Sequence, residues 1–226
     1  MSRPTAWLIS ALALAGLFLA FPGLDLLAAG LFHDPLRGFA GRGVPLLEWL
    51  HDQVGVLAWS ACLALLAGQA LASRSARAAT WLPRRRVMAY LALVLLLGPG
   101  LTVNVLFKDQ WGRARPSQVT EFGGDGRFTP AWVVSDQCHH NCSFVCGDAS
   151  VGFSLLAGAF LARRRRWFVL GLLAGGGLGL MRMAQGGHFL SDVVFSFYAV
   201  LAVAWLLHRL LFPARREPRP ALAPAA

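Results

Sequence analysis

The chain has 226 residues, of which 56% are hydrophobic and only 14% are charged, and its formal net charge is +10. Soluble domains carry about a quarter charged residues, so this composition excludes an ordinary soluble protein. The basic excess is Arg-rich and gathers between apolar blocks, which is typical of loops held at anionic lipid and does not favour a nucleic-acid partner.

Six apolar blocks follow one another along the chain, and most of them are close to the roughly 17–25 residues that a transmembrane helix needs. The fourth is shorter and is expected to extend outward through residues 146–148. Continuous apolar runs select helices over a membrane barrel, so the expected fold class is all-α and polytopic. The first block has no clear small-residue cleavage site behind it and is interpreted as an uncleaved helix. The blocks are residues 6–21, 54–72, 87–107, 149–162, 167–184 and 189–212.

The domain organisation that follows is one six-helix membrane domain, residues 1–212, and a Pro/Ala/Arg-rich tail, residues 213–226. Arginine clusters fall after the second, fourth and sixth blocks. If both termini are cytoplasmic, all three clusters lie on the cytoplasmic side, and loops 22–53 and 108–148 face the periplasm. The clusters are Arg74, Arg77 and Arg84 to Arg86; Arg163 to Arg166; and Arg209, Arg215, Arg216 and Arg219.

The first outer loop, residues 22–53, mixes polar and apolar residues. Segments 24–32 and 46–54 are expected to form short helices lying in the membrane interface. His33 and His51 are interpreted as interfacial polar residues rather than as ligands.

Three polar clusters interrupt the apolar pattern, all at outer ends of expected helices. Ionisable residues at membrane depth are costly, and they are usually functional. The clusters supply four cations, a small-residue opening of the fourth helix, and a histidine four residues before an aspartate, so together they describe an anion site. The residues are Lys108, Arg113, Arg115 and Arg182; Cys146 and Gly147; and His188 and Asp192.

His188 and Asp192 would share one face of the sixth helix if that helix begins near His188. The carboxylate can then hold one ring nitrogen while the other attacks an electrophile. This gives a nucleophile and its orienting group beside a cationic cradle.

The pattern Lys-x6-Arg-Pro, a Ser/Gly-centred motif and Arg-x5-His-x3-Asp resembles the type-2 phosphatidic-acid phosphatase superfamily. The core motifs lie within residues 108–192, and Met181 stands where a Ser is usual. The resemblance implies that His188 attacks phosphorus, giving a phosphohistidine, with Asp192 orienting it. It implies that Lys108, Arg115 and Arg182 hold the phosphoryl oxygens, and that no metal or other cofactor takes part.

The middle motif departs from the family's usual Pro-Ser-Gly-His and reads Val145-Cys146-Gly147-Asp148. Cys146 replaces the Ser donor with a weaker hydrogen-bonding group. Asp148 replaces the His that protonates the leaving oxygen, and nearby Arg residues oppose protonation of a carboxylate. Either Asp148 is a replacement acid or turnover is slow or lost; activity is favoured because every phosphate-binding residue remains.

The outer cysteines Cys138, Cys142 and Cys146 lie in a loop assigned to the periplasm, where disulfides persist. A Cys138–Cys142 bridge is the simplest pairing, with 138–146 as the alternative. Because His139 and His140 lie between the cysteines, a zinc site is a further, less favoured interpretation. Cys62 is expected to be a packing residue.

The expected activity is hydrolysis of a phosphate ester on a membrane lipid, at the periplasmic face of the bacterial inner membrane. Lipid A is the first choice of substrate, followed by phosphatidylglycerophosphate, phosphatidic acid and undecaprenyl diphosphate. The alternatives are a lipid phosphotransferase with the same intermediate and a catalytically impaired lipid-binding homologue. The expected partners are the substrate lipid and the bilayer, with no obligate protein partner.

Overall fold

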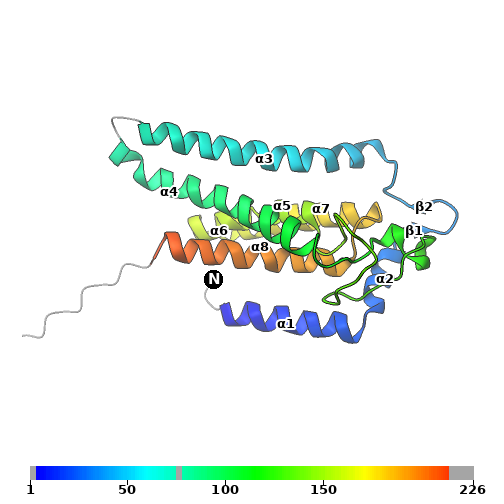
Figure 1. The fold of residues 1–226 in the computed structure, drawn as a ribbon. Helices are drawn as coiled ribbons and strands as arrows, with labels where there is room; N and C mark the ends of the chain where they lie inside the picture. Colours follow the sequence, from blue (N-terminus) through cyan, green and yellow to red (C-terminus); the bar gives the residue numbers. More distant parts are fainter. Residues whose placement is uncertain (1–3, 75–77, 214–226) are drawn as a thin grey trace, which may run out of the picture.

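The computed structural model describes residues 4–74 and 78–213 and shows a helical bundle with one elaborated end (Figure 1). Arg77 and the tail after residue 213, with Arg215, Arg216 and Arg219, lie outside the described residues. The helices are α1 (Pro4–Ala20), α2 (Gly23–Gly30), α3 (Pro45–Arg74), α4 (Ala78–Leu95), α5 (Gly147–Phe153), α6 (Leu156–Ala162), α7 (Arg165–Ala184) and α8 (Leu190–Leu211). Between them lie a π-helix, η1 (Leu96–Phe107), two 3-10 turns, η2 (Pro116–Gln118) and η3 (Thr120–Phe122), and a small hairpin, β1 (His33–Asp34) and β2 (Gly38–Phe39).

Within the described residues, 4 helices are long and apolar enough to cross a membrane: α3, Arg84–Phe107, α7 and α8. Helices α1 and α2 form a pair bent by 85°, which raises the number to 5 if the pair is one span. The fourth apolar block is shorter and is divided at Ser154 into α5 and α6. The all-α class is confirmed, whereas the expected six spans are not confirmed by length and composition.

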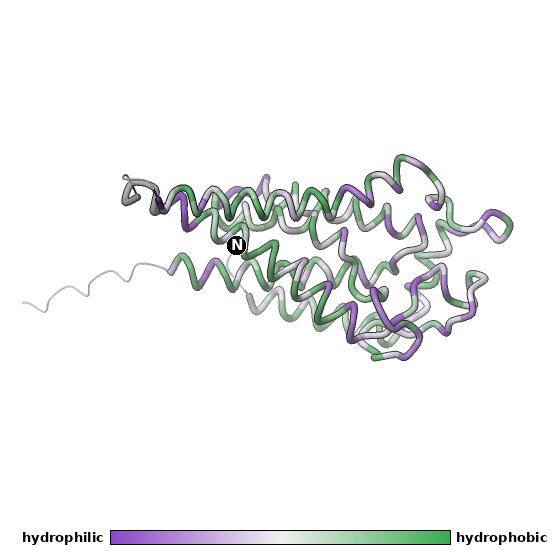
Figure 2. The backbone as a smooth tube through the Cα atoms, turned by 45° about the horizontal axis from the view of Figure 1, so that its top comes forward, coloured by the Kyte–Doolittle hydropathy of each residue, from purple (hydrophilic) through white to green (hydrophobic). Residues whose placement is uncertain are grey.

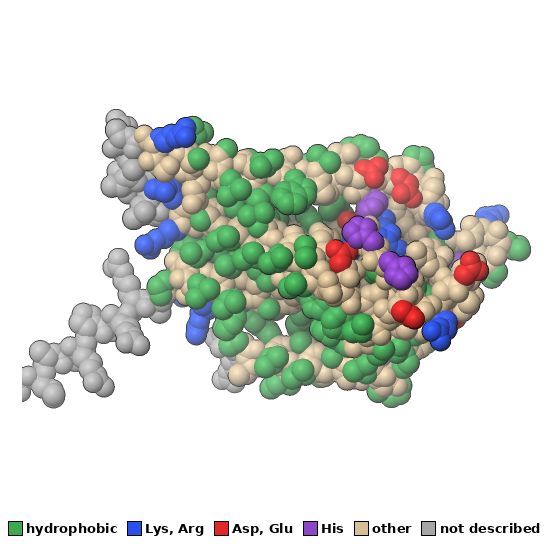
Figure 3. Space-filling view, in the orientation of Figure 1, with side chains coloured by type: hydrophobic (Ala, Val, Ile, Leu, Met, Phe, Trp, Pro, Cys, Tyr) green, Lys and Arg blue, Asp and Glu red, His purple; other side chains and the backbone are tan. Residues whose placement is uncertain are grey.

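The two ends of the bundle differ in chemistry. The start of α1, the end of α3, the start of α4, the α6–α7 connection and the end of α8 lie at one end (Figure 1). Figure 3 shows Lys and Arg side chains at that end, and His, Asp and Glu gathered with further cations at the other. The hydrophobic residues follow the helices between the two ends (Figure 2).

Helix α8 lies at the centre of the bundle and contacts α1, α2, η1 and all of α4 to α7. Helices α5 and α7 pack closely against each other at Gly152 and Gly175. A Cβ on Gly152 would lie 2.6 Å from the backbone nitrogen of Gly175, so no larger residue fits there. Small residues allow this close backbone packing between helices in lipid.

The first outer segment differs from the expectation in one respect. Residues 24–32 correspond to α2, but residues 46–54 form no separate interfacial helix and are the first turns of α3. The single glycine at the expected break, Gly55, costs a helix only about 1 kcal/mol, which is too little to end it. Helix α3 therefore runs unbroken from Pro45 to Arg74, and its start lies at the elaborated end (Figure 1).

The π-helix η1 delivers Lys108 to the same end. Pro99 lies inside it, and the Thr102 hydroxyl donates to the carbonyl of Leu97 at 2.6 Å. Proline removes one backbone donor from a helix, and π-helical segments are one way in which a helix absorbs such a defect.

Candidate active site

The three polar clusters of the sequence converge at the elaborated end of the bundle. Lys108 follows η1, Asp148 lies in the first turn of α5, and Arg182 lies in the last turn of α7. His188 lies in the short turn between α7 and α8. Four separate elements thus supply one site.

His188 is the central buried titratable group, with only 2% of its surface exposed. Its Nδ1 lies 2.7 Å from the carbonyl oxygen of Ser143 and 3.6 Å from Oδ2 of Asp192. A carbonyl oxygen can only accept, so Nδ1 carries the proton that it donates to Ser143. The neutral ring then has its lone pair on Nε2, the nitrogen available for attack.

The protonation state of His188 agrees with that assignment. Burial lowers its pKa to about 4, and the positive charges of Lys108 and Arg182 act in the same direction against the raising influence of Asp192. The imidazole therefore stays neutral and nucleophilic in neutral and mildly acidic solution.

Asp192 holds the residues around the His188 ring in place. Its carboxylate accepts hydrogen bonds from the Ser143 hydroxyl at 2.5 Å, the backbone N–H of Phe189 at 2.8 Å and Nη1 of Arg113 at 2.6 Å. The sequence suggested that Asp192 holds the ring of His188 directly. In the structure the closer partner of the ring is the Ser143 carbonyl, and Asp192 positions Ser143 through its hydroxyl.

The sequence predicts that Arg113 is a phosphate-binding cation, but in the structure its guanidinium is bound inside the protein. Its side chain is fully buried and donates to Asp192, Asp25 and Ser191, with Nε donating to the carbonyl of Thr129. Every side of the guanidinium is thus engaged, and its face lies 4.4 Å from the ring centroid of Phe189. Arg113 supports Asp192 and is unavailable to a substrate.

Asp25 also supports the site, although it lies outside the three polar clusters of the sequence. Its carboxylate is fully buried, 2.8 Å from Nη2 of Arg113, and accepts from the backbone and hydroxyl of Ser191. The only signal in the sequence is an acidic residue inside an apolar segment, which in a membrane protein indicates a buried partner.

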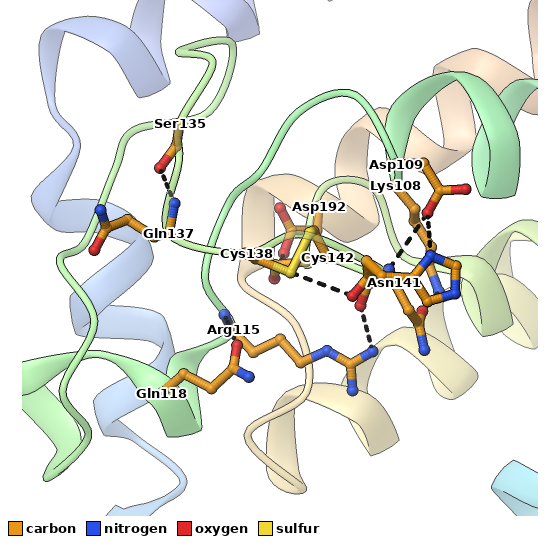
Figure 4. The surroundings of a disulfide bond; sticks show 12 residues. Lys108, Asp109, Arg115, Gln118, Ser135, Gln137, Cys138, Asn141, Cys142 and Asp192 are labelled. Carbon is orange, nitrogen blue, oxygen red and sulfur yellow. Dashed lines mark hydrogen bonds and ion pairs between the residues drawn. A yellow bond between two sulfur atoms is a disulfide. The ribbon is translucent and has the colours of Figure 1, made fainter.

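Two cations face a loop rather than a carboxylate. Lys108 Nζ donates to the side-chain oxygen of Asn141 at 3.0 Å, and Arg115 Nη2 donates to the Asn141 carbonyl at 2.7 Å (Figure 4). Burial lowers the pKa of Lys108. Lys108 and Arg115 thus both donate hydrogen bonds to oxygens of Asn141. A phosphoryl group has several acceptor oxygens and could bind both cations in its place.

Arg182 completes the cationic group. Its buried guanidinium donates to Oε1 of Gln185 at 2.7 Å, and its Nε lies 3.2 Å from Oδ2 of Asp148. Gly147 and Gly187 make room for the cations. A Cβ on Gly187 would lie 2.7 Å from Nη2 of Arg182, and one on Gly147 would lie 3.0 Å from Nζ of Lys108.

Cys146 lies in the wall of the site. It is fully buried, and burial raises the pKa of its thiol to about 12. Its backbone N–H donates to the carbonyl of Asp192 and its carbonyl accepts from Ser196, which ties the start of α5 to α8.

The sequence predicts that His51 is an interfacial polar residue, but in the structure it contacts a residue of the site. Its Nδ1 lies 2.7 Å from Oδ2 of Asp148, although the two residues are 97 positions apart. His33 differs: its ring packs on the aromatic rings of Phe39 and Phe122. The sequence holds no local signal that separates these two histidines, because the contact depends on α3 lying beside α5.

The outer loop is closed by a disulfide between Cys138 and Cys142, with 5.6 Å between their Cα atoms (Figure 4). This pairing uses two of the three cysteine sulfurs of the zinc interpretation and leaves Cys146 as a free thiol. In the described part of the chain, no group of three or more His, Cys, Asp or Glu side chains is placed to hold a metal ion. His139 and His140 are exposed, and His140 lies 3.1 Å from Asp109. Cys62 is a buried free thiol of α3, as expected of a packing residue.

The arrangement brings together a neutral histidine with a free ring nitrogen and three cations, Lys108, Arg115 and Arg182. Such a set suits nucleophilic attack on a phosphoryl group. The histidine nitrogen can attack phosphorus while the cations stabilise the charge on the equatorial oxygens.

Comparison with known proteins points to the same class of enzyme, a lipid phosphatase. Over 204 residues, the chain is 41% identical to a lipid A 4′-phosphatase of Francisella tularensis subsp. novicida (strain U112), covering 86% of this chain and 89% of the relative. It is 32% identical to a lipid A 4′-phosphatase of Rhizobium leguminosarum over 207 residues, covering 84% and 88% respectively. No solved structure matches the chain significantly.

The sequence profile of the PAP2 superfamily matches residues 86–216, which include the ends of helices that carry Lys108, Asp148, Arg182 and His188. The match covers more than half of the chain and contains every motif on which the resemblance rested. The chain belongs to the PAP2 superfamily.

Proposed function

We propose that this lipid phosphatase removes the 4′-phosphate of lipid A through a phosphohistidine on His188, at the periplasmic face of the bacterial inner membrane. The observation that carries the chemistry is the hydrogen bond from Nδ1 of His188 to the Ser143 carbonyl, which leaves Nε2 unprotonated beside the cations. The choice of lipid A rests on the names of the two relatives that align over most of their length.

In the proposed reaction, Nε2 of His188 attacks phosphorus opposite the sugar oxygen. Lys108, Arg115 and Arg182 take the phosphoryl oxygens, and the first two exchange Asn141 for substrate. Water then hydrolyses the phosphohistidine. Asp192, held by Arg113, keeps Ser143 and therefore the ring in place through both steps.

The proposed topology has six membrane crossings with both termini cytoplasmic. It counts α1 and the divided α5–α6 unit as crossings in addition to the 4 longer helices. The Arg-rich connections at the end opposite the site support a periplasmic active site by the positive-inside rule. A headgroup can then reach His188 while its acyl chains remain in the outer leaflet.

The test is phosphate release from lipid A in detergent by the purified protein, with isotope in the 4′-phosphate or only in the phosphate on the other sugar. We expect release from the first substrate alone. Release from neither substrate, with activity on phosphatidic acid or a polyprenyl diphosphate, would reject lipid A. Transfer of the label to an acceptor lipid instead of water would show a phosphotransferase.

A further inference from the structure

His51 stands outside all three motifs but reaches the site from α3. Its imidazole is 38% exposed, and its Nδ1 lies 2.7 Å from Oδ2 of Asp148, whose side chain is 16% exposed. The pair is therefore partly open to solvent at His51 and more deeply buried at Asp148, which lies in α5. Asp148 occupies the place in the middle motif where related enzymes have their proton donor.

Asp148 itself is poorly suited to donate a proton. Nε of Arg182 lies 3.2 Å from the same Oδ2 that contacts His51, and the positive charges of the site act on the carboxylate. A nearby cation stabilises the ionised form of an acid. The hydrogen bond between the two residues then runs from Nδ1–H of His51 to the carboxylate of Asp148.

This direction of the bond determines what the other ring nitrogen can do. With Nδ1–H held by the carboxylate of Asp148, Nε2 is the ring nitrogen of His51 that is free to exchange a proton with the substrate or with water. The carboxylate orients the ring, as the buried aspartate does in a catalytic triad. Glu48 and Asp52 are the other charged residues within four positions of His51 on α3, and Arg182 approaches from α7.

We propose that His51 is the general acid of this phosphatase and that Asp148 positions it, so that a dyad from α3 and α5 replaces a single histidine. The inference rests on the proposed phosphohistidine function and assigns its proton transfers. It also assigns Asp148 a positioning role in place of the role of acid considered from the sequence.

The proton and electron pairs balance over the two steps. As the bond between Nε2 of His188 and phosphorus forms, the phosphorus–oxygen bond to the lipid breaks, its electron pair goes to oxygen, and that oxygen takes the proton from Nε2 of His51. Neutral His51 then accepts a proton from the attacking water. The nitrogen–phosphorus bond breaks, its electron pair returns to His188, phosphate leaves, and His51 is again an imidazolium.

The experiment compares two leaving groups in the full-length protein in detergent. His51→Gln removes the acid, and Asp52→Asn, an exposed charge change one position along α3, is the matched control. The measured quantity is kcat/KM, which reports the steps up to departure of the leaving group and excludes hydrolysis of the phosphohistidine. On lipid A, whose leaving group is an alkoxide, His51→Gln should lower kcat/KM by roughly 100- to 10,000-fold, the usual contribution of general acid catalysis. On an alkyl-substituted nitrophenyl phosphate, whose phenolate leaves without a proton, the loss in kcat/KM should be less than about tenfold.

Three further readouts separate chemistry from structure. The alkaline limb of the pH profile of kcat/KM on lipid A should disappear in His51→Gln, and added imidazole should restore part of the rate of His51→Ala through the exposed side of the pair. Asp148→Asn alone should reduce the rate on lipid A, and Asp148→Asn combined with His51→Ala should reduce the rescue by imidazole. Equal losses on the two substrates, or no loss on lipid A, overturn the proposal.

Failure of the proposed function is distinguishable from failure of this inference. If the wild-type protein leaves lipid A intact, the lipid A assignment fails, and the comparison of leaving groups is made with an alkyl phosphate that it does hydrolyse. If Asp52→Asn is as impaired as His51→Gln, the defect lies in α3 and the acid role of His51 is rejected.

Discussion

Replacing Arg113 by Met tests whether the site depends on a buried charge group that no substrate touches. Nη1 and Nη2 of Arg113 lie 2.6 Å from Asp192 and 2.8 Å from Asp25, and all three side chains are fully buried. Met preserves an apolar stem of similar length against Phe189 but leaves both carboxylates without their cation.

The magnitude follows from the two hydrogen bonds. Each bond to a charged partner contributes about 1.5–3 kcal/mol, and removing one partner of a buried ion pair costs about 3–5 kcal/mol. We expect Arg113→Met to lower the free energy of unfolding by about 3–5 kcal/mol. Because Asp192 positions Ser143, kcat should also fall by roughly 100-fold in the protein that remains folded.

The assay is unfolding in mixed micelles by a denaturing detergent, followed by circular dichroism, with phosphate release measured in parallel. Arg127→Met is the matched control, since Arg127 lies 4.0 Å from Asp136 and both side chains are largely exposed. The control should keep wild-type stability and activity. Equal stability of the two variants would refute the reasoning.

Three other predictions concern the nucleophile, the cationic cradle and the outer loop. Burial lowers the pKa of His188 from 6.5 to about 4, so the unfolded chain takes up a proton on this ring at a higher pH than the folded protein does. The contribution of the neutral ring to stability is therefore complete above pH 6.5 and decreases as the pH falls. Near pH 4 the free energy of unfolding should be lower by about 3 kcal/mol. His188→Gln should abolish turnover and flatten this part of the stability curve measured from pH 7 to 4, and a wild-type slope in that variant would contradict the assignment. Gly187→Ala should push Arg182 aside and raise KM or lower kcat at least tenfold, by the cost of misplacing a binding group, whereas Gly176→Ala, where a Cβ meets nothing within 4 Å, should match wild type. Converting Cys138 and Cys142 to Ser should destabilise the folded protein by about 2 kcal/mol, as expected for so short a loop, and should alter KM by freeing Asn141 from Lys108 and Arg115; unchanged kinetics and melting would show that the bridge is dispensable.

The membrane class and the residues at the ends of the motifs could be predicted because they depend on local information. Apolar length identified the segments, and the spacing of Arg182, His188 and Asp192 placed them around one turn between two helices. The boundaries were less predictable. A proline inside η1 widened a helix instead of ending it, and Ser154 divided the fourth segment although its composition is continuous.

The roles of Arg113 and His51 could not be predicted, because each depends on a contact between distant segments. Arg113 lies two positions before Arg115 and has the same charge, yet Asp25, 88 positions before Arg113, pairs with it inside the protein. His51 and Asp148 meet only because α3 begins beside α5 at the elaborated end. Residue type and spacing do not identify the distant partner in either pair.

The account depends most directly on a covalent bond between phosphorus and Nε2 of His188. Lipid A labelled in its 4′-phosphate is mixed with enzyme for less than one turnover, quenched in alkali and digested, and the labelled peptide is sequenced. We predict label that is stable in alkali, lost in acid and located at His188, with more of it retained in His51→Gln when the nitrophenyl ester is the donor, because hydrolysis then lacks its base. Absence of label from wild type under these conditions, or label that persists in His188→Gln, would contradict the central claim.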